Sequence, residues 1–202
     1  GDDGILITED ADGNVIRNNV VGSSTGDGIL IRNNSDNNWV WGNIVGLGAD
    51  GLTDLGNTGH GIYIEGNSTG NIIGTDGDGT NDATEGNTVS GNSTGGIYVT
   101  GSGTDGNVIA GNLIGTDAAG TVLVGNSGNN ININQGATNT IVGGTGLFEG
   151  NVIAGGADGI TIWSSSTTGT VVLQAVVDTA GAFGPMAVMA GSPPNPAASM
   201  RR

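Results

Sequence analysis

A short apolar segment recurs along the chain, with isoleucine or valine at its first and third positions and a variable residue between them. Side chains alternate between the two faces of a strand, so the first and third residues share one face and are predicted to point inward. Successive copies lie about 24 to 35 residues apart, the period of a solenoid coil. The copies follow Gly4, Gly28, Gly61, Gly96, Asn130 and Gly159.

Two further strand signals follow the first in five of the six coils, and both begin with asparagine. The second begins at Asn14, Asn38, Asn71, Asn107 and Asn139, and the third at Asn19, Asn43, Asn87, Asn112 and Asn151. The residue two positions after each asparagine is always Ile or Val, so we predict that it points inward, as at Ile16, Val40, Ile73, Ile109 and Ile141. The residue between varies freely and is predicted to point outward.

Three strands per coil, with Gly and Asn at corners that need left-handed backbone, predict an all-β fold: a right-handed parallel β-helix of about six coils of three short strands. We place the solenoid at residues 1–163. Residues 164–202 are expected to form a C-terminal strand or cap and an Ala/Gly/Pro-rich tail. The corner asparagines are interpreted as ladders, in which each amide bonds to the amide of the next coil about 4.8 Å away.

Several aromatic side chains are predicted on the outer surface. The middle residue of the first strand gives an outward row of Leu6, Leu30, Tyr63, Tyr98, Asn132 and Thr161. Trp39 and Trp41 face outward from a second strand, and with Tyr63 and Tyr98 they are candidate substrate-binding residues, because aromatic rings stack on sugars. The alternative is that the tail or another copy of the protein covers them.

Composition restricts the partners. The net charge is −15, there is no lysine, and the arginines are Arg17, Arg32, Arg201 and Arg202. Nucleic acid and anionic membranes are poor partners, because binding them needs clustered basic side chains. No segment approaches the roughly 20 apolar residues of a membrane span.

The segment from Gly106 to Asp117, Gly-Asn-Val-Ile-Ala-Gly-Asn-Leu-Ile-Gly-Thr-Asp, resembles the right-handed β-helix repeats of large bacterial surface and secreted proteins. The resemblance covers about residues 1–163. It implies the fold and an extracellular or cell-surface location. It implies no single activity, since such repeats occur in enzymes and in non-enzymes.

The residue before each first strand falls on one corner of the solenoid, which stacks Asp3, Asp27 and His60 in consecutive coils. Two carboxylates about 4.8 Å apart along the axis approach the spacing used by retaining glycosidases, so these three residues are candidate catalytic groups. Gly1-Asp2-Asp3 and Gly59-His60-Gly61 are loosely similar to motifs of pectin-hydrolysing β-helix enzymes. The Arg-x-Lys of those enzymes is missing, and the alternative is that Asp and His simply suit a turn.

The loop at residues 75–82 carries acidic residues at alternate positions, as calcium-binding loops do. Asp76, Asp78 and Asp82 are the candidate ligands, with Glu85 in reach, because Ca²⁺ prefers oxygen ligands on glycine-rich turns. A solvated acidic loop without a metal is the alternative.

We therefore expect a non-catalytic, extracellular β-helix scaffold or glycan-contacting module, as a piece of a larger bacterial surface or secreted protein. Its expected partner is a polysaccharide, and self-association through the solenoid ends or the Trp/Tyr face is a further possibility. The alternative is a polysaccharide hydrolase or lyase, in which Asp3 and Asp27 serve as acid and nucleophile or base, and His60 orients groups or transfers a proton.

Overall fold

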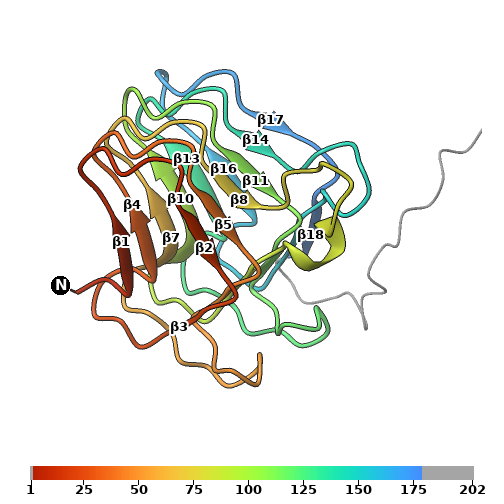
Figure 1. Ribbon diagram of the computed structural model, residues 1–202. Helices are drawn as coiled ribbons and strands as arrows, with labels where there is room; N and C mark the ends of the chain where they lie inside the picture. The colour runs from red at the N-terminus through yellow and green to blue at the C-terminus, as the bar shows by residue number, and fades with distance from the viewer. Residues whose placement is uncertain (1, 179–202) are drawn as a thin grey trace, which may run out of the picture.

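The computed structural model describes residues 2–178, so residues 179–202 of the expected C-terminal segment lie outside them. The described chain is the expected parallel β-helix, built from three six-stranded parallel sheets (Figure 1). Every third strand along the chain belongs to the same sheet. Three adjacent strands therefore complete one coil before the next coil begins.

Sheet A, sheet B and sheet C name the three sides of the coil. Sheet A contains β1 (Ile5–Ile7), β4 (Ile29–Ile31), β7 (His60–Ile64), β10 (Gly95–Thr100), β13 (Ile131–Asn134) and β16 (Ile160–Ile162). Sheet B contains β2 (Val15–Arg17), β5 (Trp39–Trp41), β8 (Ile72–Gly74), β11 (Val108–Ala110), β14 (Ile141–Val142) and β17 (Val171–Val172). Sheet C contains β3 (Val20–Val21), β6 (Ile44–Val45), β9 (Thr88–Val89), β12 (Leu113–Ile114), β15 (Val152–Ala154) and β18 (Val176–Asp178).

The six predicted coil starts are confirmed. Each first-strand isoleucine pairs in register with the one in the next coil, as Ile29 does with Ile62 and Ile97 with Ile131. The strand expected within residues 164–202 is β17, which pairs with β14. After it, β18 extends sheet C to Asp178.

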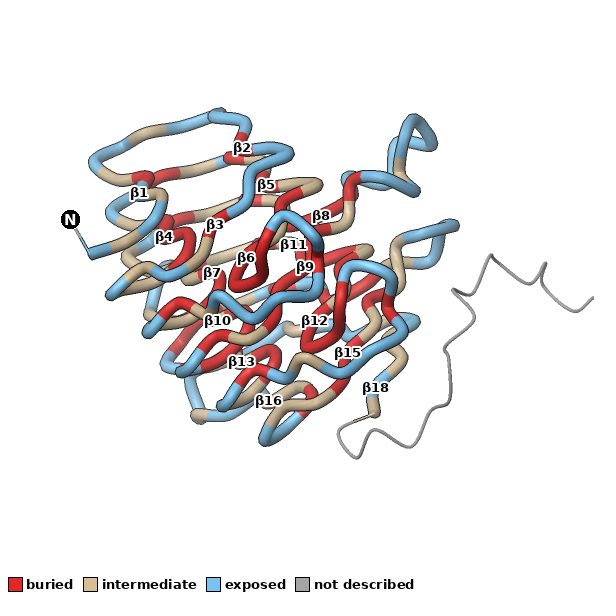
Figure 2. Tube along the Cα trace, turned by 90° about the horizontal axis from the view of Figure 1, so that it is seen from below, coloured by how far each residue is buried: buried red, intermediate tan, exposed pale blue. Residues whose placement is uncertain are grey.

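Buried residues recur on the strands of successive coils (Figure 2), and inward isoleucines and valines among them fill the interior. Ile29, Ile62, Val89, Ile109 and Ile153 are among the side chains with no exposed surface. Burying such a side chain contributes roughly 1.5–3 kcal/mol. The stack of branched aliphatic residues is therefore the hydrophobic core.

The prediction that Ile141 points inward is wrong. Val108 pairs with Ile141 and Ile109 with Val142, so Val142 is buried while Ile141 is 38% exposed. Asn139 adopts a left-handed backbone conformation, with φ of 50°, and Thr140 takes the buried corner position instead. A shift of one residue exchanges the two faces of a strand.

The register of the strand pairing confirms the outward row of sheet A. One residue of the row, Leu30, is nevertheless buried. Leu30 lies between Leu6 and Tyr63 of the adjacent coils and is only 4% exposed. Its neighbours in the row therefore cover it, although it points away from the core.

The asparagine ladders are confirmed at two corners, from Asn14 to Asn107 and from Asn19 to Asn151. Asn139 does not extend the first ladder, because its Nδ2 donates to Asp105 instead. In each rung, one Oδ1 accepts hydrogen bonds from the backbone N and the Nδ2 of the asparagine in the preceding coil. Asn38 donates both bonds to Asn71, at 2.9 and 3.0 Å, and Asn43 donates both to Asn87, at 3.0 and 3.0 Å. A third ladder, which the sequence analysis did not identify, joins Asn57, Asn92 and Asn126 at the remaining corner.

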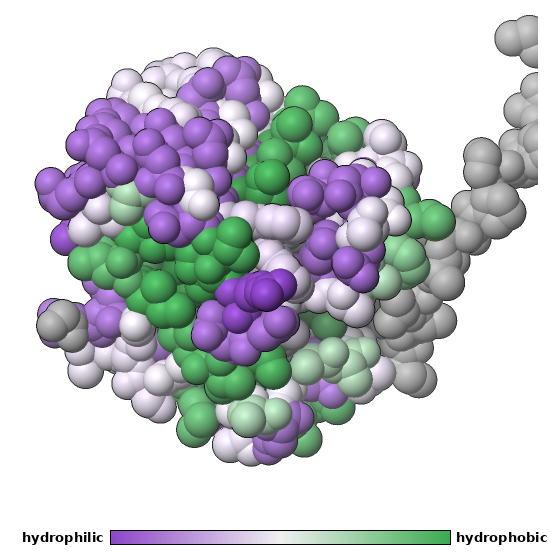
Figure 3. All heavy atoms as spheres, viewed as in Figure 1, coloured by the Kyte–Doolittle hydropathy of each residue, from purple (hydrophilic) through white to green (hydrophobic). Residues whose placement is uncertain are grey.

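The first coil forms one face of the molecule, and apolar atoms gather there between β1 and β2 (Figure 3). Leu6, Val15 and Val20 in this coil are 44–56% exposed. Self-association through this end stays a prediction. Among residues 2–178, no helix is long and apolar enough to cross a membrane.

We predict that Asn87→Ala lowers the free energy of unfolding by about 1–3 kcal/mol, because buried donors and acceptors in adjacent coils lose their partner. Asn132→Ala is the matched control. This asparagine points outward from sheet A, so its loss should change stability by less than about 0.5 kcal/mol. Urea unfolding of both variants checks the prediction, and equal destabilisation would contradict a special role for the ladder.

Candidate functional site

The corner before sheet A brings Asp3, Asp27 and His60 together as predicted. The Asp3 Oδ1 accepts a hydrogen bond from the backbone N of Asp27 at 2.9 Å, and the Asp27 Oδ1 accepts one from the backbone N of His60 at 2.6 Å. Each carboxylate thus accepts a backbone hydrogen bond from the turn of the next coil. This role fits the interpretation of these aspartates as corner residues, and catalysis by them stays a prediction.

Asp27 also contacts the imidazole of His60. The Asp27 Oδ1 lies 3.2 Å from Nδ1, and the side chains of His60 and Asp27 are 20% and 14% exposed. This contact favours the tautomer with a proton on Nδ1, which leaves Nε2 free to accept one. The arrangement can orient an imidazole for proton transfer.

The tyrosines of the outward row stack beside His60. The rings of Tyr63 and Tyr98 lie 5.0 Å apart at an interplanar angle of 23°, and the His60 ring lies 4.7 Å from Tyr98 and 5.2 Å from Tyr63. Stacking covers part of the ring faces. The hydroxyl groups are held by polar neighbours, since Tyr63 donates to Glu65 and Tyr98 donates to Asn134.

Burial raises the pKa of the Tyr63 hydroxyl, and its hydrogen bond to the Glu65 carboxylate raises that pKa further. Tyr63 therefore stays protonated around neutral pH and acts as a hydrogen-bond donor. It is not poised as a general base.

Trp39 and Trp41 point outward from sheet B, as predicted, but both have partners. Their ring centroids lie 5.4 Å apart, the Trp39 indole N–H donates to the Gly74 carbonyl at 2.7 Å, and the Arg17 guanidinium lies over the Trp41 ring at 5.2 Å. Within the described residues, their aromatic contacts are separate from those of the tyrosines. Sugar binding by Trp39 and Trp41 stays a prediction.

Trp163 is a surface aromatic that the sequence analysis did not assign to a site. It follows β16, is 52% exposed, and its indole N–H donates to the Asn132 Oδ1 at 3.2 Å. Asn132 pairs in register with Tyr98. An exposed indole is thereby attached to the outward row of sheet A.

The acidic loop brings together Asp76, Asp82 and Glu85, whose carboxylate oxygens lie within 4.8 Å of one another. The short 3₁₀ helix η1 (Asp82–Thr84) turns the chain so that Glu85 joins the cluster. Asp78 is outside it, because its Oδ1 accepts a hydrogen bond from the backbone N of Thr80. Glu85 is only 3% exposed and accepts a hydrogen bond from Thr75 Oγ1 at 2.9 Å.

Burial raises the pKa of Glu85, and the carboxylates of Asp76 and Asp82 add to this rise, while the hydrogen bond from Thr75 opposes it. The folded-state pKa thus lies above that of the unfolded chain. Ionised Glu85 reduces stability at neutral pH, and this loss disappears as the pH falls through the folded-state pKa. A bound cation would offset the same repulsion.

Solved structures with a similar fold include three of the periplasmic alginate epimerase AlgG, two of them carrying substitutions. Their TM-scores are 0.50, 0.53 and 0.56 at 16–18% sequence identity. The alignment covers 87–88% of this chain but only 40–42% of the enzyme. No family model and no curated protein sequence matches the chain. The likeness shows a shared fold.

Calcium binding by the acidic loop is tested with Glu85→Gln. The glutamine oxygen can still accept the bond from Thr75, so we expect the variant to melt higher than the parent at neutral pH in chelator, because a buried charge is removed. Added Ca²⁺ should raise the melting temperature of the parent and not of the variant, since a ligand bound only to the folded state stabilises it.

Asp78→Asn is the matched control for that experiment. Asp78 lies outside the cluster, so this variant should keep the full calcium response. No shift of the parent with millimolar Ca²⁺ would show that the loop is a solvated acidic turn.

Proposed function

We propose that the chain is a glycan-contacting β-helix module, and that its contact surface is the outward row of sheet A. The observation that carries the proposal is the half-exposed indole of Trp163, held by Asn132 in line with the stacked Tyr63 and Tyr98. Indole and phenol rings that combine apolar area with a polar group suit sugars.

The row offers a series of groups at regular spacing along the solenoid axis. Tyr63, Tyr98 and Asn132 occupy equivalent positions in three consecutive coils, and Thr161 occupies the fourth. Three coil spacings give a length of about 14 Å. This geometry favours an elongated ligand that lies along the axis and exchanges hydrogen bonds with hydroxyl and amide groups.

The charge of the chain favours a neutral glycan. Carboxylates outnumber arginines by far, and the two arginines within residues 2–178 are Arg17, on sheet B, and Arg32, directly after β4 of sheet A. An anionic polymer would be repelled unless a cation such as calcium bridged it. The similar solved structures are of an enzyme named for alginate, which supports a glycan as the class of ligand but not its identity.

We infer that contact, and not cleavage, is the primary role, because the carboxylates of Asp3 and Asp27 serve as turn acceptors for the next coil. A place in a larger secreted, surface or periplasmic protein accords with the periplasmic enzyme of similar fold. The chain spans about two fifths of that enzyme.

A glycan array, followed by affinity electrophoresis on the hits, tests the proposal. We expect Trp163→Ala and Tyr98→Ala each to weaken binding about tenfold, which corresponds to about 1.4 kcal/mol for a lost aromatic contact. Trp39→Ala, on sheet B, is the matched control and should bind like the parent. Loss of binding in Trp39→Ala with retention in Trp163→Ala would place the contact on sheet B and contradict the proposal.

An enzyme is the second candidate, and the Asp27 contact to the His60 imidazole favours it. In that case His60 would transfer a proton, and Asp3 and Asp27 would be the carboxylates of a hydrolase. Asp27→Asn should abolish any release of reducing sugar. The melting temperature should change little, because the asparagine oxygen can still accept the bond from the His60 backbone. Absence of sugar release by the parent on every array hit would exclude this candidate.

A further inference from the structure

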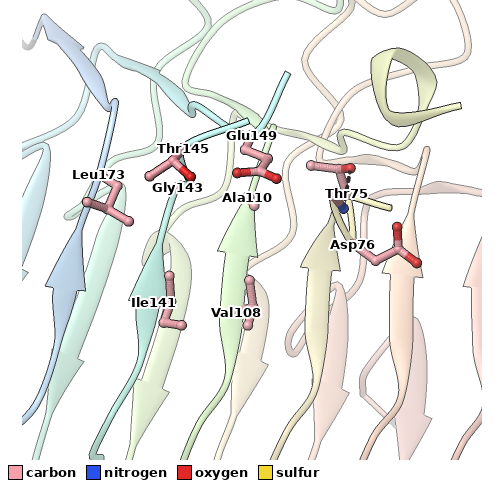
Figure 4. Close-up of a pocket in the computed structure, with 11 residues that line it drawn as sticks. Thr75, Asp76, Val108, Ala110, Ile141, Gly143, Thr145, Glu149 and Leu173 are labelled. Carbon is pink, nitrogen blue, oxygen red and sulfur yellow. Dashed lines mark hydrogen bonds between the residues drawn. The ribbon is translucent and has the colours of Figure 1, made fainter. Parts of the chain in front are cut away.

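A hollow of about 260 Å³ opens on the outer face of sheet B and is lined by residues of the last four coils (Figure 4). Its floor consists of the outward side chains of Val108, Ile141 and Leu173 and the methyl group of Ala110. The loops that follow β8 and β14 form its rim. The hollow is therefore lined by aliphatic groups and lies on a different sheet from the glycan-contacting row.

Glu149 places one carboxylate at the rim of this hollow (Figure 4). Its Oε2 accepts a hydrogen bond from the backbone N of Gly146 at 2.6 Å. A Cβ at Gly77 or Gly144 would overlap the carboxylate oxygens, so glycine at these positions leaves the space that Glu149 fills. The carboxylate is thus held in place by the backbone around it.

Within residues 2–178, Glu149 forms no ion pair, since the ion pair found there joins His60 and Asp27. Asp76 also lines the hollow, but its carboxylate belongs to the cluster with Asp82 and Glu85 and points away from Glu149 (Figure 4). The hollow therefore combines an aliphatic floor with the fixed carboxylate of Glu149, which has no cationic partner among residues 2–178.

We propose that this hollow binds a lysine side chain of a partner polypeptide. The methylene stem would pack on Val108, Ile141 and Leu173, and the ammonium group would approach the free Oε1 of Glu149. Lysine side chains commonly bury their stem on apolar surface and keep the charged end at its edge. Because this chain contains no lysine, the lysine comes from outside these 202 residues.

Two features favour lysine over other ligands. Arginine binds carboxylates best through two parallel hydrogen bonds, and here Oε2 already accepts the Gly146 N–H, which leaves one oxygen for a compact ammonium group. A sugar would find no aromatic ring in the lining, and Thr75 Oγ1 is already bonded to Glu85. The charge and the apolar floor together fit an aliphatic amine.

The test uses the whole chain in chelator, with Nα-acetyl-lysine methylamide as the probe, and follows methyl resonances by NMR. We expect the probe to shift the resonances of Val108, Ile141 and Leu173. Glu149→Gln should weaken binding at least tenfold, while its amide oxygen preserves the bond from Gly146. Asp2→Asn removes the same charge at the opposite end of the stack and should bind like the parent. Added salt should weaken binding by the parent, because the charge contact lies at the surface.

Three outcomes would overturn the proposal. The norleucine analogue, which lacks the ammonium group, could bind as well as the lysine probe, so that the contact is purely apolar. Glu149→Gln could bind the lysine probe as the parent does. The methyl resonances could instead shift with protein concentration and not with the probe, which would identify the occupant as a second copy of the chain.

Discussion

The asparagine amide ladder is the interaction on which the rest of this structure depends. Each buried Oδ1 accepts one bond from a backbone N–H and one from an amide of the preceding coil, as Asn112 does from Asn87 at 3.0 and 2.9 Å. A slipped coil would leave these buried groups without partners. The ladders therefore fix the register, and the register determines which side chains lie above one another in outward rows.

The rows explain why function is expected on the outer surfaces and not in the interior of the coils. The interior is filled by stacked isoleucine and valine, so only the outer faces and the loops carry free chemical groups. Sheet A presents tyrosine, asparagine and an exposed indole in line. Sheet B presents two tryptophans with partners of their own and, farther along, the aliphatic hollow beside Glu149. The two faces suit ligands of different chemistry.

Most of the fold could be predicted from the sequence because one residue type recurs at each corner and a branched aliphatic residue follows it at a fixed distance. Prediction failed where two registers satisfied the same pattern. Ile141 and Val142 can each fill an inward position, and the choice depends on Asn139 adopting a left-handed conformation. Trp163 was missed because its contact with Asn132 joins residues in adjacent coils, outside any repeat signal. Asp78 was favoured by its alternate spacing, yet a local backbone bond holds it away from the cluster that Glu85 joins.

The central claim is that ligand contact occurs along the outward row of sheet A. It is tested most directly by following the indole N–H resonances of the tryptophans during titration with a glycan from the array. The chain contains three tryptophans, so each resonance can be assigned by substitution. We predict that the Trp163 resonance moves while those of Trp39 and Trp41 stay in place. Movement of the Trp39 and Trp41 resonances with a stationary Trp163 resonance would contradict it.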